Sequence, residues 1–230
     1  MSGNGCVAEA RARWRQRAKS HFNCVNNTKG KLPALLAGVG GLSYSISFVI
    51  LARSAPDVSA VLSPLFLALG GPLASAVLLA LYNRVRETEP TFALWALLMG
   101  TVAALGSALH GGYDLANAIN PPALGSGLQT SLNALPSQID PRGLLTFGVS
   151  GVAFLILASL IVRGGQLPKG LGYLGLLLGV LLIVVYLGRL ILLQPTNPFL
   201  LGAAALTGFL ASPLWYIWLG VVLLRRPNAQ

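Results

Sequence analysis

Charged residues are scarce in this chain. Only 10% of its 230 residues are Asp, Glu, Lys or Arg, whereas a soluble domain carries about a quarter. Hydrophobic residues make up 54% of the sequence, and they are grouped into runs too long for the strands or core helices of a soluble domain. Lipid is therefore the expected solvent for most of this surface.

Cysteine is also rare, and familiar catalytic motifs are missing. Cys6 and Cys24 are the only two cysteines, and neither has a His/Cys pair nearby at the spacing of metal ligands. The sequence contains no P-loop, dinucleotide-binding fingerprint, HExxH, GxSxG or CxxC motif. We therefore predict no metal site, and the sequence identifies neither a cofactor nor a catalytic residue.

Acidic residues number only six against sixteen Lys and Arg, which gives a formal charge of +10. Seven of the basic residues precede Leu32, and most of the others lie at the ends of apolar runs. This distribution is typical of a membrane protein that faces anionic headgroups. No nucleic-acid reading module accompanies the basic segment, so nucleic acid is not predicted as a partner. The predicted partners are the lipid bilayer and its anionic headgroups, with other membrane subunits as further candidates.

Six apolar segments have about the 20 residues needed to cross the hydrocarbon core of a bilayer. We predict helices for all six, because backbone polar groups in lipid must be satisfied within the segment itself. The predicted spans are 33–52, 64–82, 90–116, 143–162, 168–193 and 198–224.

Proline marks the beginning of each apolar segment. In three cases it follows a residue whose side chain can cap a helix, as in Ser63-Pro64, Asp140-Pro141 and Asn197-Pro198. Proline is well tolerated at the first helical position, because the backbone N–H there has no partner within the helix. Six such starts favour six separate helices over fewer, longer ones.

The positions of the basic residues predict the orientation. With the N-terminus in the cytoplasm, 13 of the 16 Lys and Arg residues fall on the cytoplasmic side and three outside, as the positive-inside rule requires. We therefore predict an all-α, polytopic six-helix transmembrane bundle in the cell membrane, with both termini cytoplasmic. Its parts are a basic tail (1–31), the transmembrane domain (32–226) and a short cytoplasmic end (227–230).

The first apolar segment has a second interpretation, as a cleaved signal peptide with its cleavage site near Ser54. The apolar run exceeds the usual h-region of about 7 to 15 residues, and the basic stretch before it is unusually long. Both features favour a retained helix and leave cleavage as the alternative.

The basic tail has the pattern of an amphipathic helix. Apolar residues recur at steps of three or four between residues 7 and 22, and basic residues surround them. Such a helix can lie in the headgroup layer with its tryptophan buried; a topogenic tail without fixed structure is the other interpretation. The predicted lipid-surface residues are Arg11, Arg13, Trp14, Arg15, Arg17 and Lys19.

The third predicted helix carries a cluster of polar residues within an apolar run. His110 and Asp114 are four residues apart, and Tyr113 and Asn117 continue the same sector of the helix. Ionisable residues inside a membrane segment are hypotheses for function, and a carboxylate beside an imidazole suits acid–base chemistry or a proton relay. A solvated helix end with a purely structural role is the competing interpretation.

The fifth predicted helix offers a partner for this cluster. Arg189 is expected at about the same depth as Asp114, and Tyr186 lies one turn further in, as His110 does. We predict an ion pair between Asp114 and Arg189 that joins the two helices. The alternative is that Arg189 extends alone toward the outer headgroups.

Other irregular features are two internal prolines and a long connection. Pro72 and Pro213 fall inside predicted helices, where each removes a backbone hydrogen bond and predicts a kink. We favour a packing role for both over an ion-coordinating break. The connection 117–142 predicts a short interfacial helix, as a passive connector or as a lid over an outer cavity.

Two stretches show a family resemblance. The sequence LHGGYD at 109–114, together with LPKGLGYLG at 167–175 and YLGR at 186–189, resembles a family of small bacterial polytopic membrane proteins known only as a domain of unknown function. The resemblance covers about the C-terminal half, and the long basic tail departs from the short N-terminus of that family. It implies a helical membrane fold of similar size and no established activity, so no catalytic residue is carried over.

Three functions fit these observations. The sequence favours a non-catalytic membrane component, such as a subunit or regulator of a larger complex. A small transporter or channel is the alternative, and an integral membrane enzyme acting on a lipid-soluble substrate is third. A transporter predicts an interior cavity with kinked helices at its wall. An enzyme predicts that His110, Asp114 and Arg189 converge on an open pocket. A subunit predicts a flat groove, filled by lipid or by a partner, and no such pocket.

Overall fold

The computed structural model describes residues 54–120, 139–140, 142–191 and 197–225, together with eight single positions between Leu35 and Leu51. The predicted amphipathic tail with its lipid-surface residues, most of the first predicted helix and most of the long connection lie outside the described residues. Whether the first apolar segment is cleaved is also not tested, because most of that segment lies outside the described residues.

The described residues form helices and no strand. They are α4 (Pro56–Val85), α5 (Pro90–Ile119), α7 (Ser150–Gly164), α8 (Lys169–Ile191), α9 (Pro198–Ala205) and α10 (Ser212–Arg225), with the π-helical segments η2 (Leu144–Val149) and η3 (Leu206–Ala211). The segment η2 continues directly into α7, and α9, η3 and α10 form one continuous run. Five helical spans are thus long and apolar enough to cross a membrane. The prediction of an all-α protein is confirmed for the described residues.

Helix starts follow the proline pattern at Pro90 and Pro198, and differ from it at Pro64 and Pro141. Pro198 is the first residue of α9, and the Asn197 side chain accepts a hydrogen bond from the Phe199 backbone N–H at 3.0 Å, as the cap prediction requires. The prediction that a helix begins at Ser63-Pro64 is wrong, because α4 begins two turns earlier at Pro56 and runs through Pro64.

The reason for this error is local. A proline also stands at the true start of α4, so the second proline is not needed to begin the helix. Ser63 does not cap the helix; its hydroxyl lies 3.4 Å from that of Ser59, one turn earlier.

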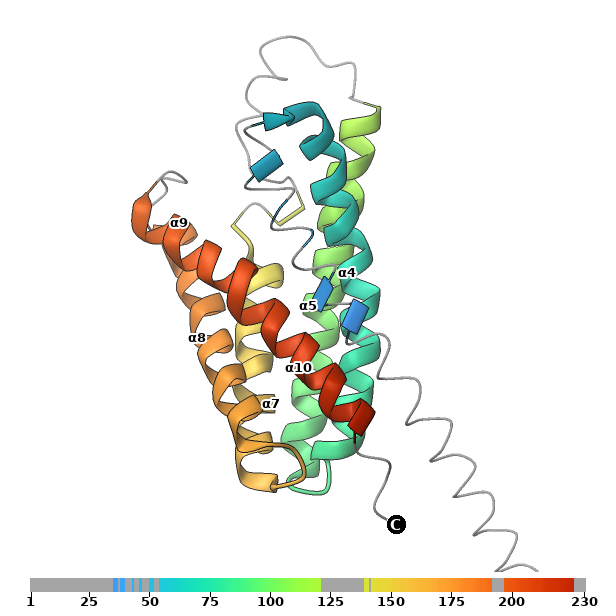
Figure 1. Cartoon of the computed structure of the whole chain (residues 1–230), viewed down its shortest axis with the longest axis vertical. Coiled ribbons are helices and arrows are strands. Elements are labelled where there is room, and N and C mark those ends of the chain that lie inside the picture. Colours follow the sequence, from blue (N-terminus) through green and yellow to red (C-terminus); the bar gives the residue numbers. More distant parts are fainter. Residues whose placement is uncertain are drawn as a thin grey trace, which may run out of the picture.

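The helices pack as an antiparallel bundle (Figure 1). The helices α4 and α5 lie side by side along the long axis, α7 packs against both α5 and α8, and the run from α9 to α10 crosses the other helices diagonally. The connections α4–α5 and α7–α8 meet at one end of the bundle, where the Gln166 side chain donates a hydrogen bond to Glu87. The end of α10 lies there as well.

Small residues allow α4 and α5 to touch. A Cβ atom placed on Gly71 of α4 would collide with the Ala104 carbonyl of α5, and one on Gly111 would collide with the Ala68 backbone nitrogen and lie 2.6 Å from the Pro64 carbonyl oxygen. Backbones approach this closely only where side chains are minimal. The glycine at position 111 is therefore part of the helix contact.

A tryptophan at the centre of the core joins α10 to α8. The Trp215 side chain is 1% exposed, and its indole N–H donates a hydrogen bond of 3.1 Å to the Leu171 carbonyl. Phe154 of α7 meets the indole edge to face, with ring centroids 4.8 Å apart. Such a ring pair adds about 0.5–1.5 kcal/mol to the area that it buries.

The glycine contact gives a matched test with two adjacent positions. We expect Gly111→Ala to destabilise the protein by about 1–3 kcal/mol, because the added methyl group overpacks the α4–α5 contact. Gly112→Ala should leave stability unchanged or slightly higher, since no described atom lies within 4 Å of its Cβ position and alanine is the better helix former. Thermal unfolding in mild detergent measures both. Equal effects at the two positions would contradict the predicted contact.

Candidate functional site

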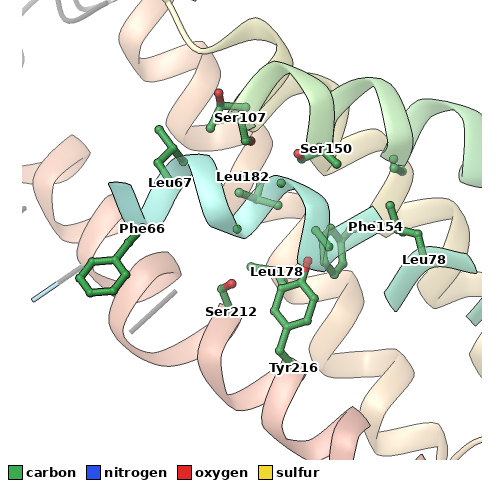
Figure 2. Close-up of a pocket in the computed structure, with 17 residues that line it drawn as sticks. Phe66, Leu67, Leu78, Ser107, Ser150, Phe154, Leu178, Leu182, Ser212 and Tyr216 are labelled. Atoms are coloured by element: carbon green, nitrogen blue, oxygen red, sulfur yellow. The ribbon is translucent and has the colours of Figure 1, made fainter. Parts of the chain in front are cut away.

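The helices line a half-open cavity of about 180 Å³. It lies at the central turns of α4, α5 and α8, and its remaining walls are the η2–α7 junction and the η3–α10 junction. Figure 2 shows side chains from these helices arranged around the space, including Phe66 and Leu67 of α4, Phe154 of α7 and Tyr216 of α10.

The cavity exists because the facing residues of α4 and α5 are small. Gly70, Gly71 and Ala74 contribute from α4, and Gly100 and Ala104 from α5. Gly70 has no described atom within 4 Å of its Cβ position, so a side chain there would extend into open space. The small residues that bring the two helices together thus also leave room beside their contact.

Both π-helical segments end at the cavity. Thr146 lies within η2 and Ser150 directly after it, while Ser212 follows η3 directly; all three line the cavity. Pro213 comes next on α10, and Pro72 lies beside the lining residue Gly71. A π-helical turn loosens the regular backbone ladder and is frequent at functional sites. The two internal prolines that the sequence singled out therefore lie beside the cavity wall.

The cavity is mainly apolar, and its polar groups are uncharged. Hydroxyl groups come from Ser107, Thr146, Ser150, Ser212 and Tyr216, and no described residue that lines the cavity carries a charge. A charged ligand would need a counter-charge in such a place. The lining therefore suits a neutral molecule.

Two of these hydroxyls are available to a ligand. Ser107 donates to the Ala103 carbonyl at 3.1 Å and Ser150 to the Leu145 carbonyl at 3.5 Å, so both are engaged with their own helices. Among the described residues, the hydroxyls of Ser212 and Tyr216 have no hydrogen-bond partner. These two residues are four apart on α10, which places them on one face of the helix, and Figure 2 shows both beside the cavity.

The polar cluster of α5 lies next to the cavity. The Nε2 atom of His110 is 3.2 Å from a carboxylate oxygen of Asp114, and its Nδ1 atom is 3.5 Å from the Thr146 hydroxyl. The imidazole is buried, whereas 29% of the Asp114 side chain is exposed. The cluster thus reaches from a partly exposed carboxylate, through a buried imidazole, to a hydroxyl in the cavity wall.

The start of η2 is held by a buried carboxylate. A carboxylate oxygen of Asp140 accepts a hydrogen bond of 2.9 Å from the Thr146 backbone N–H, and Asp140 is 4% exposed. The backbone N–H groups in the first turn of a helix lack partners within the helix, so this bond satisfies one of them. The prediction that Asp140 is the N-cap of a helix beginning at Pro141 is wrong, because the helix begins at Leu144 and its N-cap is Gly143. No sequence signal marked Thr146, whose hydroxyl lies within an apolar run.

The predicted ion pair between Asp114 and Arg189 is wrong. Asp114 pairs with His110 of its own helix, while the Arg189 guanidinium carbon lies 5.3 Å from the centroid of the Phe147 ring. The Arg189 carbonyl accepts a hydrogen bond of 3.4 Å from Arg142. Equal depth predicted the pair, but α8 presents Arg189 to the start of η2 rather than to α5.

The remaining predicted residues lie outside the cavity wall. Tyr186 of α8 packs on Gly148 of η2, where a Cβ atom would lie 3.1 Å from its ring. Tyr113 and Asn117 are partly buried on α5 and do not line the cavity. No group of three or more metal-binding side chains occurs among the residues that the structure describes.

Comparison of the chain with protein-family models, with curated proteins and with solved structures found no match. The resemblance to a family of small polytopic membrane proteins therefore stays a prediction. The function of the chain is inferred from the cavity and the polar cluster of α5 beside it.

The Asp140 cap can be tested against a matched aspartate. We expect Asp140→Ala to lower the free energy of unfolding by about 1–2 kcal/mol, because the Thr146 backbone N–H loses its acceptor. Asp57 also lies in a first helical turn but is exposed, so Asp57→Ala should cost less. Denaturant titration in detergent micelles gives both values, and a loss at Asp57 as large as that at Asp140 would refute the cap.

Proposed function

We propose that this chain is a multi-pass membrane protein that acts as a small transporter, with a binding site for a small neutral solute in its interior cavity. The observation that carries the proposal is the uncharged cavity at the central turns of the bundle, with a π-helical segment on two of its walls.

A membrane location is supported by the outer surface of the bundle. Large apolar side chains point outward along α4 and α5, among them Leu69, Leu79, Leu98 and Leu105, each about half exposed. Apolar patches on a soluble monomer seldom exceed a few hundred Å². Lipid would cover these side chains without any further partner.

The proposed orientation places both termini in the cytoplasm. Arg84, Arg86, Arg163 and Lys169 gather at the end of the bundle where the α4–α5 and α7–α8 connections meet. The positive-inside rule assigns that end to the cytoplasm, and the first predicted helix then crosses from inside to outside ahead of α4.

A transporter fits the cavity better than the other two functions. An enzyme would need His110, Asp114 and Arg189 around one pocket, and none of the three lines this cavity. A subunit or regulator, which the sequence favoured, predicts a flat groove filled by lipid or by a partner rather than a pocket among the central turns of the helices. Prolines and π-helical segments lie beside the cavity in helices that are otherwise continuous, and irregular helical turns of this kind are frequent at functional sites.

Thiol labelling tests the orientation. In a chain with Cys6 and Cys24 replaced by serine, we expect a thiol introduced by Asp57→Cys to react with a membrane-impermeant maleimide added outside intact cells. Glu89→Cys should react only after permeabilisation, because it lies at the opposite end of the bundle. Both side chains are exposed, so the two variants are matched. Labelling of Glu89→Cys alone in intact cells would reverse the proposed orientation.

Filling the cavity tests the transport proposal. We expect Gly70→Leu to lower the flux of glycerol and of acetamide into proteoliposomes at least about tenfold, since the added side chain occupies the cavity. Gly202→Leu is the matched control, because Gly202 is an exposed helical glycine that also has no described atom within 4 Å of its Cβ position. Stopped-flow light scattering measures the flux.

Xenon binding, followed by its NMR shift, checks that the cavity itself is filled, since apolar cavities of about this size bind xenon. Loss of xenon binding in Gly70→Leu without any loss of flux would show that solutes do not pass through the cavity. Wild-type flux no higher than that of empty liposomes would reject the transporter and favour the subunit.

A further inference from the structure

Thr146 is part of the cavity wall and also contacts His110 of the polar cluster of α5. Its hydroxyl lies 3.5 Å from the Nδ1 atom of His110, and the residue is one of those that line the cavity. Its backbone N–H is held by the buried carboxylate of Asp140, which fixes the position of the residue. A change in the protonation state of His110 can therefore alter the hydrogen bonding of a residue in the cavity wall through the Thr146 hydroxyl.

The hydrogen-bond partners of His110 determine which ring nitrogen carries a proton when the imidazole is neutral. An ionised carboxylate can only accept, so the Nε2 atom beside Asp114 bears the hydrogen. The Nδ1 atom is then an acceptor, and the Thr146 hydroxyl donates to it. Because the only hydrogen of the Thr146 hydroxyl is engaged, its oxygen can act toward the cavity only as a hydrogen-bond acceptor.

Protonation of His110 reverses this arrangement. One proton taken up from the outer solvent forms a new N–H bond at Nδ1, which becomes a donor to the Thr146 oxygen. The threonine O–H bond stays intact, and its hydrogen must turn away from the ring. Because Thr146 lines the cavity, we expect this hydrogen to turn to the cavity, so that Thr146 then presents a donor to it.

We propose that His110 is a proton-linked switch, so that the cavity takes up a small neutral solute carrying an oxygen acceptor, such as an amide or an alcohol, together with one proton. The inference rests on the proposed transport function and names the class of its substrate and its coupling ion. The partly exposed Asp114 carboxylate gives the proton its route from the outer surface.

The charged groups around the imidazole come from three elements. Asp114 lies on α5 itself, Asp140 precedes η2, and Arg142 and Arg189 lie at the start of η2 and on α8, with Arg189 against Phe147. The segment of α4 that packs on α5 beside His110, from Pro64 to Ala68, contains no titratable side chain. A proton on His110 therefore forms an ion pair with Asp114 instead of an isolated buried charge.

Proton uptake must change the affinity for the solute by the same factor by which solute binding changes the affinity for the proton. If protonation of His110 strengthens solute binding, the solute must strengthen proton binding by the same factor. The chain is well suited to this measurement, since it contains only two histidines. In the His21→Gln variant of the full chain, every histidine signal belongs to His110.

The experiment is an NMR titration of the ¹⁵N-labelled histidine ring of that variant in nanodiscs, with acetamide as the probe. Without acetamide, we expect the neutral ring to carry its proton on Nε2. Saturating acetamide should raise the proton affinity of His110 by roughly fivefold or more, a typical coupling between sites. In Thr146→Val the ring should still titrate, but acetamide should no longer change its proton affinity.

Thr207→Val is the matched control. Thr207 is a buried threonine in the other π-helical segment, its hydroxyl donates to the Ala203 carbonyl at 2.7 Å, and it does not line the cavity. This variant should keep the full effect of acetamide on His110. An effect that survives in Thr146→Val, or a wild-type ring that acetamide leaves unchanged, would overturn the switch. Either result would leave the transport proposal standing if Gly70→Leu still blocks solute flux, so the two proposals fail separately.

Discussion

The close approach of α4 and α5 is the constraint on which the rest of the structure depends. Gly71 faces the Ala104 carbonyl and Gly111 faces the Ala68 backbone, so the two long helices touch through their backbones at two levels. Helices that meet this closely cannot fill the space beside the contact with their own side chains. The cavity is the space that remains, and α7, α8 and α10 line it from the other sides.

The start of η2 links the cavity to the outer part of the bundle. Asp140 holds the first turn of this segment through the Thr146 backbone, and the Arg189 side chain lies over the Phe147 ring. The Thr146 hydroxyl lies beside His110, and the residue lines the cavity. One short segment therefore determines where two buried polar groups and a cationic side chain lie relative to each other.

Polarity divides the interior into two regions. The cavity is lined by hydroxyls and small apolar groups, and ionisable side chains lie beside it rather than within its wall. A neutral solute could enter such a cavity without the desolvation cost that a charged one would incur.

Much of the helical architecture could be predicted from the sequence. The lengths of the apolar runs, the prolines at helix starts and the Asn197 cap are local features, and local hydrogen bonding is enough to make them visible. The pairing of His110 with Asp114 was also visible, because residues four apart on a helix are neighbours. The early start of α4 was not predicted. Pro56 and Pro64 could each begin that helix, and the sequence alone does not show which of the two does.

The cavity, the role of Thr146 and the partner of Arg189 were decided only by the tertiary structure. Apolar periodicity fixes how long a helix is and which face is apolar, but not how the helix is rotated against its neighbours. Arg189 and Asp114 lie at similar depth and still do not pair, because α8 directs the arginine to η2. Thr146 gains its position from contacts with residues 36 positions earlier and six positions earlier in the chain. The sequence by itself determined that the chain forms long apolar helices, and the packing of those helices determined what their polar residues face, because hydropathy is a property of each residue whereas a contact depends on two.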